Sequence, residues 1–324
     1  MGERQPYVSI RHLRTYFDLT RGVFEKKQIV KAVDDVSLDI YPGETLGLVG
    51  ESGCGKSSLG RTIVKINKPT SGRILIDGTD IAGLKGGALK QFRREVQMIF
   101  QDPYASLNPR MTVGEIIREP MDIHGIGETS EARNARVAEL LRTVGLKPDH
   151  VRRYPHEFSG GQRQRISIAR TLAVNPRFII CDEPISALDV SIQAQIINLL
   201  KRVQREMNIA YLFIAHDIGM VKHISDRIGV MYLGRLVEIG DSAEVYFKPL
   251  HPYTKALLSA IPIPDPVAGK ARRRVMLEGE LPSPVNPPPG CPFRQRCPLA
   301  ERRCAETMPE LREKDGRMVA CHRV

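Results

Sequence analysis

The sequence lacks any long hydrophobic run. Nowhere in its 324 residues do apolar residues continue without interruption for about 18 positions, the length that predicts a membrane-spanning helix. The opening residues, Met-Gly-Glu-Arg-Gln-Pro, also lack the apolar core of a secretory signal. We therefore expect a chain that reaches a membrane only through a partner.

Basic residues interleaved with aromatic residues, the pattern that stacks nucleic-acid bases, are missing as well. The formal charge is +11, but the arginines are scattered, with one compact run at Arg272-Arg273-Arg274. Such a charge fits nucleic acid, acidic lipid headgroups or a solvated surface. The scatter favours a solvated surface and nucleotide-site charge, and we expect no nucleic-acid partner.

Cysteine is scarce except at the C-terminal end. Two of the six cysteines, Cys54 and Cys181, lie within other motifs, and the remaining four occur in the last 34 residues. In a cytosolic chain, as expected here, disulfides are rare. Four clustered cysteines then indicate a metal site more often than two bridges.

Glycine, by contrast, is concentrated where it can bind phosphate. Residues 50–57 fit the motif G-x-x-x-x-G-K-[ST]. They read Gly50-Glu51-Ser52-Gly53-Cys54-Gly55-Lys56-Ser57. The motif lies between a predicted strand, Thr45–Val49, and a predicted helix. The glycines let backbone N–H groups surround an anion at the helix N-terminus. Lys56 is expected to reach the β- and γ-phosphates of a nucleotide, Ser57 to ligate Mg²⁺, and Ser58 to join the nucleotide site.

Strands and helices alternate through the rest of the chain. Early alternating segments, including Val30–Ile40, predict an antiparallel β layer, and Val113–Val144 predicts helix. Later buried strands at Arg177–Asp182 and Ala210–Ala215 are separated by a helix. The pattern predicts an α/β fold with a mainly parallel sheet. After about residue 248, prolines become frequent, which indicates an extended tail.

Two further motifs supply chemistry. The strand that ends in Asp182-Glu183 predicts a carboxylate for Mg²⁺ at Asp182 and a group that polarises the attacking water at Glu183. In Ser159-Gly160-Gly161-Gln162, the serine can cap a helix while the glycines expose their N–H groups. This makes a second anion-binding helix terminus.

Three motifs together resemble those of ATP-binding-cassette (ABC) ATPases: the phosphate loop, the signature Phe158-Ser159-Gly160-Gly161-Gln162, and Asp182-Glu183. In the signature, Phe158 stands in place of the usual leucine. The resemblance covers roughly residues 7–250. It implies a P-loop ABC ATPase with a RecA-like parallel-sheet core, an antiparallel β subdomain and a helical subdomain that carries the signature. ATP would be held between the phosphate loop of one subunit and the signature of another.

The same resemblance implies roles for isolated residues. Gln101 corresponds to the Q-loop glutamine that contacts Mg²⁺ and the attacking water, and His216 to the switch histidine at the γ-phosphate. Asp189, in Ser186-Ala187-Leu188-Asp189, corresponds to the D-loop at the dimer interface. Phe17, with Tyr16 as an alternative, would stack on adenine.

The segment with His251-Pro252-Tyr253 resembles the C-terminal extension of dipeptide and oligopeptide importer ATPases, and the intact signature is more like their F-type subunit. This implies a second, D-type ATPase subunit, two membrane permeases and an extracytoplasmic peptide-binding protein. The chain would lie peripherally at the cytoplasmic face of the cell (inner) membrane. We expect an ATPase domain at 1–248 and the extension at 249–324.

The cysteine cluster has the spacing C-x5-C-x6-C-x16-C, without the paired knuckles usual for zinc. Iron–sulfur clusters accept wider spacings. Some peptide-importer ATPases carry a [4Fe–4S] cluster here, which would be ligated by Cys291, Cys297, Cys304 and Cys321. Zinc or free thiols remain alternatives.

Two rival functions remain. A soluble ABC ATPase acting on nucleic acid or the ribosome usually carries a long coiled coil between its motifs or two cassettes in one chain. Here Lys56 and Ser159 are only 103 positions apart, and there is one cassette. The other rival is an iron–sulfur sensor with incidental ATPase activity, which the complete hydrolytic set disfavours.

Overall fold

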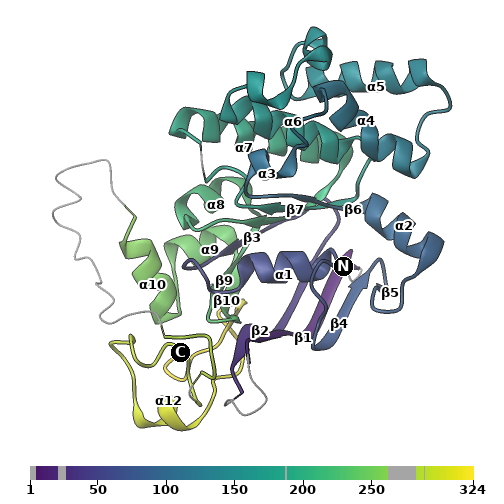
Figure 1. The fold of residues 1–324 in the computed structure, drawn as a ribbon. Coiled ribbons are helices and arrows are strands. Elements are labelled where there is room, and N and C mark those ends of the chain that lie inside the picture. Colours follow the sequence, from purple (N-terminus) through teal and green to yellow (C-terminus); the bar gives the residue numbers. More distant parts are fainter. Residues whose placement is uncertain (1–4, 21–26, 187, 262–281, 288) are drawn as a thin grey trace, which may run out of the picture. The chain divides into compact units, whose positions relative to one another are not determined.

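A computed structural model describes residues 5–20, 27–186, 188–261, 282–287 and 289–324. Ala187 of the predicted D-loop and the run Arg272-Arg273-Arg274 lie outside these ranges. The chain divides into two compact units. The first comprises residues up to 41, 45–82 and 213–324, and the second comprises 42–44 and 83–212. Figure 1 shows the elements of each unit.

The first unit contains the expected antiparallel layer. Its four strands, in the order β2-β1-β4-β5, are β2 (Ile29–Ile40), β1 (Val8–Asp18), β4 (Ser71–Ile76) and β5 (Thr79–Asp80). In β2, Val36 and Leu38 are buried, whereas Ser37 and Asp39 are only partly buried. This two-residue alternation of burial confirms the prediction of half-buried strands.

A second set of strands in this unit carries the phosphate loop. In the order β11-β12-β10-β9-β3, they are β11 (Arg312–Lys314), β12 (Arg317–Val319), β10 (Arg235–Asp241), β9 (Arg227–Tyr232) and β3 (Thr45–Val49). Only β3 and β9 are parallel among these, so the predicted mainly parallel sheet is in fact mixed here. The reason is a tight hairpin between β9 and β10, where Leu233 and Gly234 both have positive φ.

The helices of the first unit are short: α1 (Lys56–Ile63), α8 (Ile218–Ile224), α9 (Ser242–Phe247), α10 (Pro252–Ser259) and α12 (Arg302–Glu306). The residues after 249 are joined to this set of strands, because β12 pairs with β10 through Val319 and Glu238. The domain boundary at 248/249 stays a prediction. No helix among the described ranges is long and apolar enough to cross a membrane.

The second unit is mainly helical around two parallel strands. In chain order it contains α2 (Gly86–Glu95), β6 (Val96–Ile99), α3 (Pro103–Ser106), α4 (Val113–His124), α5 (Ser130–Thr143), the 3₁₀ turns η1 (Pro148–Arg152) and η2 (Pro155–Glu157), α6 (Gly160–Leu172), β7 (Phe178–Asp182) and α7 (Val190–Met207). Strand β8 (Ala210–Ile214) contains the boundary between the units. The predicted helical segment 113–144 is two helices, because α4 ends at His124 and Gly125, which follows it, adopts the left-handed conformation.

Candidate nucleotide-binding and hydrolysis site

The phosphate loop connects a fully buried strand to a helix, as predicted. Strand β3 ends at Val49, and α1 starts at Lys56. Gly55 is the N-cap residue of α1 and has a φ of 104°, in the left-handed region. A Cβ at Gly50 would lie 2.2 Å from the Met231 carbonyl oxygen, and one at Gly55 would lie 1.9 Å from that of Ala32. Only glycine allows this close approach of backbone, so the loop geometry requires both residues.

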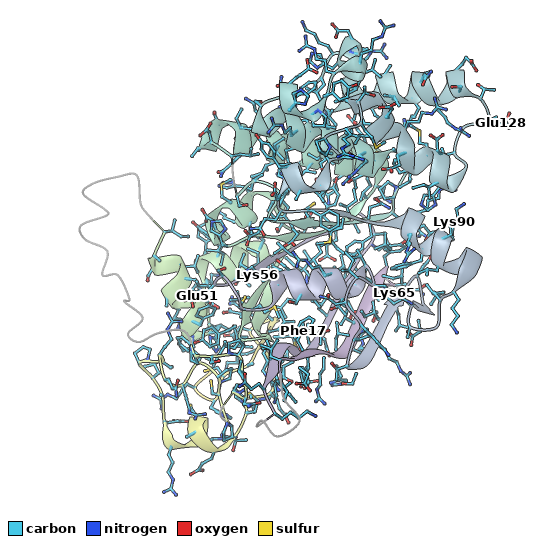
Figure 2. All side chains as sticks on the ribbon, in the orientation of Figure 1. Phe17, Glu51, Lys56, Lys65, Lys90 and Glu128 are labelled. Atoms are coloured by element: carbon cyan, nitrogen blue, oxygen red, sulfur yellow. The ribbon has the colours of Figure 1, made fainter. Side chains whose placement is uncertain are left out.

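The loop lysine is buried inside this turn. Lys56 is 4% exposed, and its Nζ donates hydrogen bonds to the carbonyl oxygens of Gly50 at 2.7 Å and Glu51 at 3.0 Å (Figure 2). No acidic residue lies in the first turn of α1, which also begins with Ser57 and Ser58. A buried ammonium at an uncharged helix N-terminus is suited to an anion such as a phosphate.

Two other predicted residues lie in the same unit. His216 is exposed just after β8 and just before Asp217, whose carboxylate caps α8 by accepting from Gly219 N and Met220 N. Phe17 is 37% exposed on β1. The alternative Tyr16 is engaged, because its hydroxyl donates to the Asp34 carboxylate. Burial and this carboxylate raise the pKa of Tyr16 to about 12. The geometry thus favours Phe17 as the ring available for stacking.

In the second unit, parallel pairing brings Gln101 to Glu183, the carboxylate that the sequence predicts to be catalytic. Strands β6 and β7 align so that Ile99 lies opposite Cys181, and both strands end at the same edge. There, Gln101 Nε2 donates a 2.8 Å hydrogen bond to Glu183 Oε2. Glu183 has a φ of 45°, a left-handed conformation that is costly for a residue with a Cβ. Asp182, the preceding residue, is fully buried.

The signature and the D-loop also meet in this unit. Ser159 and Gln162 form a reciprocal capping box at the start of α6: Gln162 N donates to Ser159 Oγ, and Ser159 N donates to Gln162 Oε1. A Cβ at Gly161 would lie 2.6 Å from Cγ2 of Ile192, in the first turn of α7. Asp189 is the N-cap residue of α7. The two helices therefore begin in close contact.

Comparison with known families agrees with these geometries. Residues 33–186 match the ABC transporter family, and residues 237–304 match the oligopeptide/dipeptide transporter C-terminal region. The chain is 60% identical over 320 residues to the putative oligopeptide transport ATP-binding protein YkfD of Bacillus subtilis, covering 98% of this chain and 96% of that protein. It is 53% identical to the oligopeptide transport ATP-binding protein OppF of Salmonella typhimurium, covering 99% and 97%.

The chain belongs to the oligopeptide/dipeptide group of ABC transporter ATPases. Among solved structures, it resembles the dimeric structure of the ATP-binding cassette MJ0796 bound to ADP and Pi. The TM-score is 0.65 and the identity 30%, covering 72% of this chain and 98% of that one. The predicted family and ABC fold are confirmed. This placement does not favour the rival ATPase acting on nucleic acid or the ribosome.

Analysis of the sequence missed two interactions of this ABC ATPase. Arg163, only 6% exposed, stacks its guanidinium 3.7 Å from the centroid of Tyr104 and donates to the carbonyl oxygens of Pro155 and His156. It links the segment after Gln101 to the segment before the signature. The sequence signal for this contact was Arg163, directly after the signature, and the aromatic Tyr104, shortly after Gln101.

The second missed interaction joins the C-terminal extension to the phosphate loop. Tyr253 Oη accepts a 2.9 Å hydrogen bond from Glu51 N, and Arg296 donates to the Glu51 carboxylate at 2.8 Å. Around these contacts, the rings of Tyr232, Tyr253 and Phe293 meet at centroid distances of 4.7–5.4 Å. The sequence predicts the His-Pro-Tyr segment only as a family feature and does not predict this contact.

The four C-terminal cysteines are free thiols, and Cys291 lies close enough to the other three to interact with them electrostatically. Burial, together with the other three thiols, raises the pKa of Cys291 to about 11. Burial also raises the pKa of Cys297 and of Cys321. Within the described part of the chain, however, no three His, Cys, Asp or Glu side chains are arranged to hold a metal ion. The residue type fits a metal centre, but this side-chain arrangement does not.

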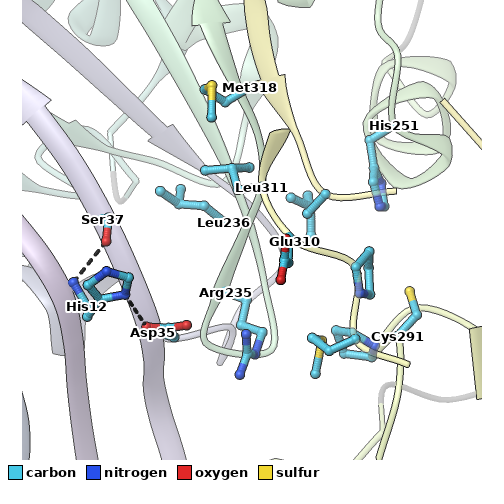
Figure 3. A pocket seen from close by; sticks show the side chains of 15 residues that line it. His12, Asp35, Ser37, Arg235, Leu236, His251, Cys291, Glu310, Leu311 and Met318 are labelled. Atoms are coloured by element: carbon cyan, nitrogen blue, oxygen red, sulfur yellow. Dashed lines mark hydrogen bonds and ion pairs between the residues drawn. The ribbon is translucent and has the colours of Figure 1, made fainter. Parts of the chain in front are cut away.

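A separate cavity of about 610 Å³ lies beside the same extension. Figure 3 shows its lining, which includes Arg235, His251 and Leu311 together with His12 and Asp35, which are hydrogen-bonded at 2.9 Å. Of the predicted site residues, it contains only Cys291. It is therefore distinct from the phosphate loop.

Proposed function

We propose that this chain is the ATP-hydrolysing subunit of a dipeptide/oligopeptide importer, coupling ATP binding and hydrolysis to peptide uptake across the cytoplasmic membrane. The observation that carries the proposal is the hydrogen bond between Gln101 and Glu183 at the shared edge of β6 and β7, beside the buried Asp182. A glutamine and two carboxylates there can hold a divalent cation and orient a water molecule.

The other motif residues have separate roles in this proposal. The segment Gly50–Ser58 binds the triphosphate, with Lys56 at the β- and γ-phosphates. Ser57, Gln101 and Asp182 would hold Mg²⁺, which neutralises phosphate charge when bound. Glu183 polarises the attacking water, His216 contacts the γ-phosphate, and Phe17 stacks on adenine.

A second ATPase chain completes each site. The N-terminus of α6, with Ser159, Gly160, Gly161 and Gln162, would bind ATP held by the partner's phosphate loop, and Asp189 would lie at that interface. The structure of the similar cassette MJ0796 is dimeric. We infer a D-type ATPase partner, two permeases and an extracytoplasmic peptide-binding protein, with this chain peripheral at the cytoplasmic face.

Purification of the tagged chain from membranes in mild detergent tests this assignment. Recovery of a second ABC ATPase and two polytopic permeases, with ATP turnover that rises when the peptide-loaded binding protein is added, is the expected result. Recovery of ribosomes or nucleic acid without a permease would overturn it. Glu183→Gln in the same preparation separates turnover by this chain from turnover by its partner.

We further propose that Cys291, Cys297, Cys304 and Cys321 bind an iron–sulfur cluster. Their proximity supports this, and the absence of a ready metal geometry within the described residues means that their side chains must reorient to bind it. A cluster would cross-link a segment with short helices and strands.

The test is elemental analysis after anaerobic purification. Iron and acid-labile sulfide should both be present in the native chain and be lost in Cys297→Ser. Zinc without sulfide would replace the iron–sulfur assignment with a zinc site. Protein with neither metal would show that the thiols are free, and would leave the ATPase proposal intact.

A further inference from the structure

Glu51, inside the phosphate loop, is held at three points. Its backbone N–H donates to Tyr253 Oη at 2.9 Å, and its carbonyl oxygen accepts from Lys56 Nζ at 3.0 Å. Its carboxylate forms a 2.8 Å ion pair with Arg296 Nη1. Two of the three partners belong to the C-terminal extension, and the third is the phosphate-binding lysine. Figure 2 shows Glu51 and Lys56 next to each other at the start of α1.

The partners from the extension are buried and well supported. The Arg296 side chain is only 10% exposed and that of Glu51 is 26% exposed, so water screens their attraction incompletely. Tyr253 is fully buried and packs edge-on against Tyr232, with ring centroids 4.7 Å apart. Neither partner has the freedom of a surface side chain, so both fix the position of Glu51.

The charge of Glu51 makes this contact consequential. A carboxylate one residue after Gly50 lies in the loop that must accept a polyanionic triphosphate, and like charges at short range repel strongly where solvent is partly excluded. Arg296 neutralises that carboxylate and draws it toward the extension. The Tyr253 hydroxyl holds the backbone of the same residue.

We propose that Arg296 and Tyr253 are positioning residues for ATP binding, acting through Glu51 to neutralise and orient the phosphate loop. This inference rests on the proposed function, since it assumes that the loop binds ATP. It makes the C-terminal extension part of the nucleotide site and assigns a function to the Tyr of its His-Pro-Tyr segment.

The first measurement is ATP turnover by the assembled transporter as a function of ATP concentration. Arg296→Ala should raise KM for ATP by about tenfold, the usual worth of a charge-assisted hydrogen bond, with kcat changed by less than about twofold. Arg296→Lys, which retains the charge, should recover most of the loss. Arg302→Ala is the matched control, because Arg302 is 92% exposed in the same extension and pairs only with Glu306 in the described contacts.

The second measurement separates charge from packing. Adding Glu51→Gln to Arg296→Ala removes the uncompensated carboxylate and should return KM to within about threefold of the native value. Tyr253→Phe keeps the ring and loses only the hydroxyl, so KM should rise by about two- to fivefold.

The outcomes distinguish this inference from the proposed function. Failure of Lys56→Ala to weaken ATP binding would contradict the proposed function itself. If Lys56→Ala weakens binding but Arg296→Ala matches Arg302→Ala, the positioning role is wrong. The positioning role is also wrong if KM for ATP is as high in the double variant as in Arg296→Ala, because lost packing would then explain the increase.

Discussion

Gln101 and Glu183 are 82 residues apart in the sequence, yet the amide of one donates a 2.8 Å hydrogen bond to the carboxylate of the other. The contact follows from the parallel register of β6 and β7, in which Ile99, the last residue of β6, lies opposite Cys181, next to the last residue of β7. The hydrogen bond fixes one carboxylate oxygen of Glu183, and the remaining lone pairs of the carboxylate can accept a proton from water. The strained backbone of Glu183 adds to this orientation.

Glu183→Gln should lower ATP turnover by about 10²- to 10⁴-fold, the usual contribution of a general base, while ATP binding is retained. The amide keeps the size of the side chain and an oxygen that can accept from Gln101, but it cannot take a proton. Turnover by the assembled transporter and binding of a fluorescent ATP analogue measure the two effects. Glu139→Gln is the control, since the Glu139 side chain is 59% exposed in the same unit. Turnover equal to that control would contradict the role of Glu183.

Lys56→Ala should weaken nucleotide binding itself. The substitution removes the ammonium held at the N-terminus of α1, and a charged hydrogen bond is worth about 1.5–3 kcal/mol. Equilibrium titration with the ATP analogue should show at least about a tenfold loss of affinity. Lys90→Ala, at an exposed position of α2, serves as the control. Equal affinity of the two variants would exclude Lys56 from the phosphate site.

The local parts of this site could be predicted from the sequence because each depends on short-range rules. The spacing of Gly50, Gly55 and Lys56 specifies a strand–loop–helix, and a buried strand ending in Asp182 specifies where a carboxylate emerges. The hairpin of β9 and β10 was not predicted, although Leu233-Gly234 is a turn sequence, and it makes the sheet mixed. Its strands are buried along nearly their whole length, so their burial shows no alternation between the two faces.

The contact between Arg296 and Glu51 could not be predicted for a different reason. The two residues are 245 positions apart, and Arg296 lies in an irregular segment with no period to indicate which way its side chain points. Only the tertiary packing of Tyr232, Tyr253 and Phe293 brings the extension to the loop.

Stability should fall in mild acid because of His251. Its ring is buried, and burial lowers its pKa to about 3, so the folded chain holds it neutral. Its Nδ1 accepts from Tyr253 N at 3.0 Å, while Glu238 accepts from its backbone N–H and Lys255 lies nearby. The unfolded chain, with a His pKa near 6.5, binds the extra proton. Stability is therefore full above about pH 6.5 and decreases as the pH falls toward 3.

The expected loss from this residue between pH 7.5 and 5.5 is about 1.4 kcal/mol in the free energy of unfolding. Denaturant titrations at the two pH values measure it. His251→Asn can still cap α10, since Asn is a good N-cap, but it does not titrate, so the pH dependence of this variant should be smaller by that amount. An identical pH dependence in the variant and the native chain would show that another group is responsible.

Gly160 and Gly161 should respond differently to alanine, although they are adjacent in the signature. A Cβ at Gly160 would make an ordinary 3.5 Å contact with Leu188, so Gly160→Ala should be neutral or stabilise the fold by up to about 1 kcal/mol. A Cβ at Gly161 would lie 2.6 Å from Cγ2 of Ile192, which cannot move without moving the start of α7.

Gly161→Ala should therefore destabilise the fold by about 1–3 kcal/mol, the usual cost of overpacking. Thermal unfolding of the two single variants provides the comparison. Adding Ile192→Ala to Gly161→Ala removes the clashing methyl group and should restore part of the loss, whereas adding it to Gly160→Ala should not. If the two glycine variants melt alike, close approach of α6 and α7 is not what requires glycine at position 161. The expected difference would show that Gly161 is needed for the contact between the signature helix and the helix that follows Asp189, independently of any role in nucleotide binding.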